Sequence, residues 1–80
     1  MQPMPFKDKV RIALQEMLDD GEFDKMIRYA KGKEKKEILK IKQALINADG
    51  IDNIPYLPLI MNIHSELVFQ DLFIYMAEMV

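Results

Sequence analysis

The residue types that act as nucleophiles in enzymes are almost absent from this chain. Its 80 residues include no Cys and no Thr, and the only Ser and the only His are neighbours, Ser65 and His64. A nucleophilic hydroxyl needs a base within hydrogen-bond reach, whereas adjacent side chains on a helix point about 100° apart. His64 is therefore poorly placed to activate Ser65, and we expect no catalytic triad. The absence of Cys also excludes disulfide scaffolds and thiolate zinc sites.

The carboxylates and glycines do not match a known ion or nucleotide motif. His64, Asp71 and Glu78 follow one another at intervals of seven residues, which spaces them about 10.5 Å apart along a helix, too far for one metal ion. Neither Gly21 nor Gly50 fits the fixed glycine of a calcium loop, because the last ligand position then holds no glutamate. Three scattered glycines also cannot form a phosphate-binding loop. We expect no metal, no cofactor and no enzymatic activity.

Charge is distributed in three blocks that the net value of −2 conceals. Residues 1–24 carry three basic and six acidic side chains, residues 25–42 carry eight and two, and residues 43–80 carry five acidic side chains with no Lys or Arg. Within the middle block, Lys33, Lys36 and Lys40 form a candidate basic patch for phosphates or other anionic surfaces. A helix, a connection containing Gly32 and a second helix also suggest a DNA-binding helix-turn-helix.

Other features of the basic block argue against specific DNA recognition. Lys31 and Lys33 flank Gly32 where a helix-turn-helix needs apolar side chains, and lysines contact phosphates with little reading of bases. Two alternatives stay open. The block can be a solvated face on which Glu34 and Glu37 pair with lysines at helical spacing, or it can attract an acidic protein.

The apolar spacing and the turn residues predict an all-α fold, a small four-helix domain that spans residues 1–80. Asp-Gly pairs and Gly32 mark the helix ends, and Pro5 and Pro58 suit first turns. An alternative for the C-terminal part is a strand over 56–63 followed by a separate helix from Ser65, so an interruption near His64 is the main open question. The predicted helices are 5–19, 23–31, 33–48 and 58–79.

The last predicted helix has two apolar strips separated by polar bands, unlike an ordinary amphipathic helix. One strip contains Val68, Leu72, Tyr75, Met76 and Met79, and the other contains Ile63, Leu67 and Ile74. The rest of an 80-residue chain can cover one strip, which leaves the other for a partner chain. The alternative is a helix that its own domain covers on all sides. The candidate partner-interface residues are Ile63, Leu67, Ile74, Tyr75 and Met79.

These features favour a protein that acts through its surfaces. We expect a non-enzymatic protein–protein interaction module, a regulator, adaptor or inhibitor, that forms a homodimer through its C-terminal helix. The alternative is a weak nucleic-acid-binding regulator that uses Lys33, Lys36 and Lys40. Residues 54–80 are rich in apolar side chains but carry several charges, so we expect no membrane span. The N-terminal residues 1–5 show no export signal, which predicts a cytoplasmic protein.

Overall fold

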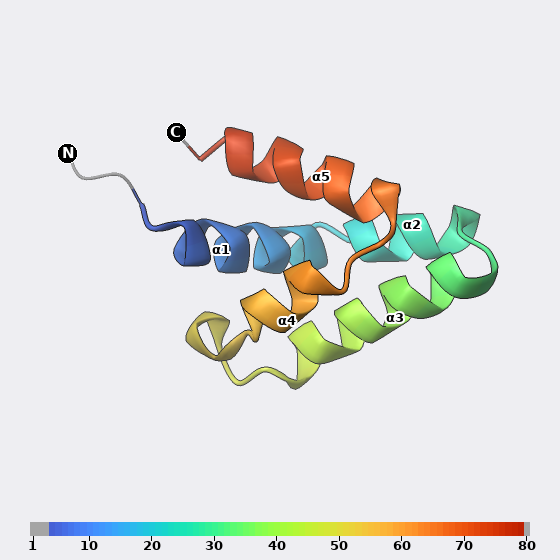
Figure 1. Cartoon of the computed structure of the whole chain (residues 1–80), viewed down its shortest axis with the longest axis horizontal. Helices are drawn as coiled ribbons and strands as arrows, with labels where there is room; N and C mark the ends of the chain where they lie inside the picture. Colours follow the sequence, from blue (N-terminus) through green and yellow to red (C-terminus); the bar gives the residue numbers. More distant parts are fainter. Residues whose placement is uncertain (1–3, 80) are drawn as a thin grey trace.

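The computed structural model describes residues 4–79, and Figure 1 shows their arrangement. The described chain is built from helices and contains no strand, which confirms the all-α prediction. Residues 1–3, on which the absence of an export signal partly rests, lie outside the described part. The elements are α1 (Phe6–Asp19), α2 (Glu22–Tyr29), α3 (Gly32–Asn47), the short 3₁₀ helix η1 (Ile51–Asn53), α4 (Tyr56–Met61) and α5 (Glu66–Ala77).

The first three helices begin and end within two residues of the predicted bounds. Gly21 and Gly32 adopt positive φ angles of 77° and 62° at the two turns, a backbone conformation that glycine enters without steric cost. The apolar stripe of α1 becomes the centre of the core, because Val10, Ala13 and Leu14 are fully buried. α1 contacts α2, α3, α4, η1 and α5, and in Figure 1 it lies between α5 and the pair formed by α3 and α4.

The prediction of one continuous helix over 58–79 is wrong, and so is the alternative strand over 56–63. The chain forms α4, leaves helical geometry at residues 62–65, and begins α5 at Glu66. Ser65 has an extended backbone, and its Oγ accepts a 3.4 Å hydrogen bond from the Val68 N–H, which is an N-cap contact. The break also lets Ile63 enter the core, where it is only 4% exposed. The interruption near His64 is therefore confirmed.

None of the helices within residues 4–79 is long and apolar enough to cross a membrane.

Candidate interaction surfaces

The side of α5 that points away from the core carries large apolar side chains. Val68 and Leu72 are buried on the inner side, whereas Leu67, Phe73 and Ile74 are 40%, 65% and 55% exposed. Phe73 stacks on Phe69 with their ring centroids 6.3 Å apart. We call the exposed side the α5 outer face, which consists of Leu67, Gln70, Phe73, Ile74 and Ala77. It offers a partner an apolar surface in which Gln70 is the one polar member, and the exposed Glu66 borders it.

The five predicted interface residues do not all belong to this face. Leu67 and Ile74 lie on it. Ile63 is buried in the core, so its place on the exposed strip with Leu67 and Ile74 was wrong. Tyr75 and Met79, predicted on the other strip with Val68 and Leu72, are partly buried against the core. The placement of Ile63 assumed one straight helix from 58, and the break before α5 removes Ile63 from the face that Leu67 and Ile74 share.

Phe73 is an exposed aromatic residue that the predicted interface did not include. It follows Glu66 by seven positions and Gln70 by three, so it continues the polar band of the helix. An aromatic side chain in a polar band is expected to be exposed on a helix, and this spacing is the signal that could have identified it.

Two polar side chains border the inner side of α5. The Tyr75 hydroxyl donates a 2.7 Å hydrogen bond to the Asp20 carboxylate, and this contact raises the pKa of Tyr75. Burial raises the pKa of Asp71 from its ordinary value of 3.8 to about 6, and the neighbouring Glu22 carboxylate acts in the same direction. One oxygen of Asp71 is buried without a hydrogen-bond partner in the described structure. Asp71 therefore lies partly buried beside Glu22 of α2.

Two glutamates of α3 hold the beginning of α5. The Glu37 carboxylate accepts hydrogen bonds from the backbone N–H groups of His64 and Ser65, at 2.5 and 2.8 Å. The Ser65 hydroxyl donates to Glu34 at 2.9 Å. Negative charge beside the first turn of a helix is also favourable for the helix dipole. The expected pairing of Glu34 and Glu37 with lysines is wrong, because in residues 4–79 neither carboxylate forms an ion pair.

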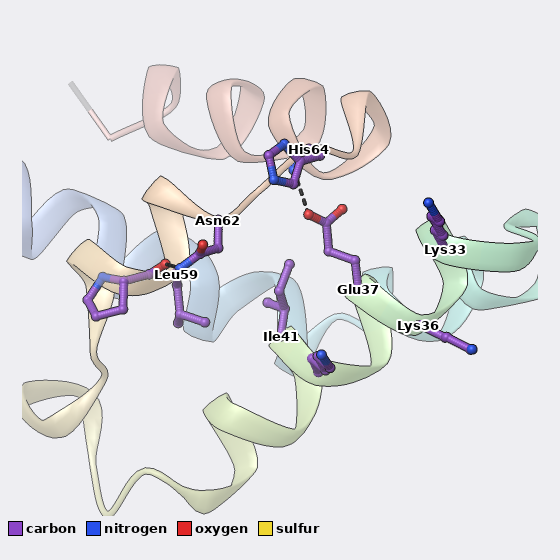
Figure 2. Close-up of a pocket in the computed structure, with 9 residues that line it drawn as sticks. Lys33, Lys36, Glu37, Ile41, Leu59, Asn62 and His64 are labelled. Carbon is purple, nitrogen blue, oxygen red and sulfur yellow. Dashed lines mark hydrogen bonds between the residues drawn. The ribbon is translucent and has the colours of Figure 1, made fainter.

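A pocket opens beside these contacts, between α3 and the segment that links α4 to α5 (Figure 2). Its volume is about 590 Å³, and its lining includes all three predicted basic-patch residues, Lys33, Lys36 and Lys40. Figure 2 shows Ile41 of α3 and Leu59 of α4 on opposite sides of the hollow, with Asn62 and His64 above them. We call this site the α3–α4 pocket. Its lining combines lysine side chains and the Glu37 carboxylate with aliphatic walls.

The described residues contain no group of three or more His, Asp or Glu side chains arranged to hold a metal ion. No protein-family model, curated protein or solved structure matches this chain. The two surfaces therefore have to be interpreted from their own chemistry.

Proposed function

We propose that this protein is a non-enzymatic protein–protein interaction module that self-associates through the α5 outer face, with a homodimer as its smallest assembly. The observation that supports this proposal is the exposure of Leu67, Phe73 and Ile74 on a helix whose other side is already buried. Each large apolar side chain that an interface removes from water contributes about 1.5–3 kcal/mol when it becomes fully buried. Three such residues on one helix form a compact centre for an interface.

A second copy of the chain supplies a surface that complements this face. On α3, Leu39 and Ile46 are exposed and seven residues apart, the same spacing as Leu67 and Ile74 on α5. Lys35 and Lys42 flank the α3 pair, although Lys42 already pairs with Asp24 of α2, and the exposed Glu66 and Glu78 flank the α5 pair. Opposite charges around matching apolar pairs favour association and fix its register.

The two surfaces cannot meet within one copy. α3 and α5 both pack on α1, and Figure 1 shows them on opposite sides of that helix. Their exposed sides therefore point away from each other, and a contact between them requires two molecules. We call the exposed pair Leu39 and Ile46, with its flanking lysines, the α3 outer strip.

The experiment is sedimentation velocity of the full chain over a range of micromolar concentrations. We expect the fraction of wild-type protein that sediments as a dimer or larger species to increase with concentration. Leu67→Glu and Ile74→Glu should be folded by circular dichroism but monomeric, because each places a charge in the apolar interface. Leu57→Glu is the matched control, since Leu57 is an exposed leucine of α4 outside the α5 outer face. A stable wild-type monomer, together with loss of folding in both α5 variants, would assign this face to the monomer core.

A further inference from the structure

We propose that the α3–α4 pocket binds an acidic peptide segment of a partner protein that inserts one aliphatic side chain. This site is separate from the α5 outer face, because none of the residues that line it belongs to that face. The proposal therefore goes beyond self-association and names a second partner by its chemistry.

One carboxylate, Glu37, lines the pocket together with three lysines. In the described part of the chain, Lys33, Lys36 and Lys40 form no ion pair. Glu34 and Glu37, the acidic residues closest to them in sequence, instead accept hydrogen bonds from the start of α5. The backbone N–H groups that bind Glu37 stabilise its negative charge in place. The lining therefore carries three ammonium groups against one carboxylate that is already hydrogen-bonded, and this excess of positive charge favours an anionic ligand.

The lysine spacing suits a ligand with several charges in a row. Successive members of the trio are three and four residues apart, which corresponds to about 4.5 and 6 Å along the helix axis. Side chains on one side of an extended peptide repeat about every 6.6 Å. Carboxylates at alternating positions of an extended peptide can thus each lie near one flexible lysine. A single small anion would use only part of this row.

The aliphatic walls select for an apolar side chain beside the acidic residues. Ile41 is nearly buried, Leu59 is half-buried, and Pro58 adds a third apolar side chain to the lining. A volume of about 590 Å³ lies within the usual range of 300–1,000 Å³ for ligand pockets. Burial of one leucine or isoleucine side chain here would orient the segment along α3. Asn62 and His64 on the other side carry groups that can hydrogen-bond to a peptide backbone.

The same lining disfavours nucleic acid as the ligand. Proteins that bind single strands stack the bases on aromatic side chains, and the residues that line this pocket include no Phe, Tyr or Trp. Duplex DNA would use the lysines for phosphate contacts but would leave the aliphatic walls unoccupied. An acidic peptide with one aliphatic side chain uses both features.

The test is fluorescence anisotropy of a labelled peptide in which one leucine precedes glutamates at alternating positions. We expect Lys36→Gln/Lys40→Gln to weaken binding by roughly tenfold, because two charge contacts are lost. The matched control Lys7→Gln/Lys9→Gln removes the same charge from α1 and should leave the affinity within about twofold. Circular dichroism verifies that both variants are folded.

Three further measurements distinguish this peptide from a purely electrostatic ligand and from nucleic acid. Replacement of the peptide leucine by asparagine should weaken binding, and equal binding would show that only charge matters and overturn the proposal. A labelled oligonucleotide single strand of equal charge should bind more weakly, and tighter binding would assign the pocket to nucleic acid. Leu67→Glu should bind the peptide like the wild type, so a failure of self-association and a failure of the pocket proposal are distinguishable.

Discussion

The α5 outer face and the α3–α4 pocket are both exposed, but they depend on the fold in different ways. The outer face comes from a single helix, so its composition follows from which side of α5 the core covers. The pocket comes from α3, the end of α4 and the link before α5, and the Glu34 and Glu37 contacts hold these parts together. Substitutions in the link should therefore disturb the pocket and the stability of the fold, whereas substitutions on the outer face should affect association alone.

Substitutions of two isoleucines should show the largest effect of this difference. Ile63 in the link is 4% exposed and Ile74 on the outer face is 55% exposed. Ile63→Ala leaves a cavity in the core and should lower the free energy of unfolding by about 2–4 kcal/mol. Ile74→Ala should change that free energy by less than about 0.5 kcal/mol in the monomer. Urea unfolding at a protein concentration that keeps the chain monomeric measures both, and equal losses would contradict the comparison.

The hydrogen bonds of Glu37 provide the second test. Glu37→Ala leaves the N–H groups of His64 and Ser65 without their acceptor, which should cost about 1–3 kcal/mol of unfolding free energy. Glu37→Gln keeps one carbonyl acceptor and should lose less. Urea unfolding gives the stability, and amide NMR signals of the two residues should shift in both variants. Self-association should persist, and its loss together with unchanged stability would show that the outer face also depends on this contact.

These contacts also explain how far the sequence predicts the fold. α1, α2 and α3 were predicted within two residues because their apolar stripes and glycine turns are local features. The break between α4 and α5 is stabilised by Glu37, which lies 27 and 28 residues away in sequence from the two N–H groups that it binds. Helical spacing does not contain that information. Only the capping pair Ser65 and Glu66 indicated it.

The candidate surfaces show the same limit. Lys33, Lys36 and Lys40 were grouped because they share one side of a predicted helix, and all three line the α3–α4 pocket. The opposite wall of the pocket consists of Leu59 in α4 and Asn62 directly after it, and these residues could not be associated with the lysines before the chain was folded. Ile63 was assigned to the apolar strip of Leu67 and Ile74 because a continuous helix was assumed, and in the link it lies in the core instead.

Asp71 tests the inner side of α5 through pH. Its pKa is about 6 in the folded chain against an ordinary value of 3.8, so the folded state binds a proton more readily than the unfolded state. The unfavourable effect of this carboxylate is absent below pH 3.8, grows between the two values, and is complete at pH 7. Glu22 and Asp20 disfavour its charge, and Lys25 partly offsets them.

The matching variant is Asp71→Asn, which cannot acquire this charge. It should raise the unfolding free energy at pH 7 by about 1 kcal/mol, a value discounted for partial exposure to solvent, and the gain should disappear near pH 4. Asp52→Asn is the control, because Asp52 is exposed in η1. Thermal unfolding of the wild type and both variants across this pH range measures the difference. A gain that does not vary with pH would assign the effect to packing.

The smallest expected effect concerns the charges around the outer face. If the α5 outer face meets the α3 outer strip of a second copy, Lys35→Glu and Glu78→Lys should each weaken self-association by a few-fold, because exposed ion pairs contribute about 0.2–1 kcal/mol. The double variant Lys35→Glu/Glu78→Lys should recover part of that loss, since it reverses both partners. Sedimentation velocity at low and high salt measures the effect, which salt should reduce. If the losses of affinity from the two charge reversals add in the double variant, the α5 outer face contacts a surface other than the α3 outer strip. A symmetric pairing of two α5 helices then becomes the better description of the dimer.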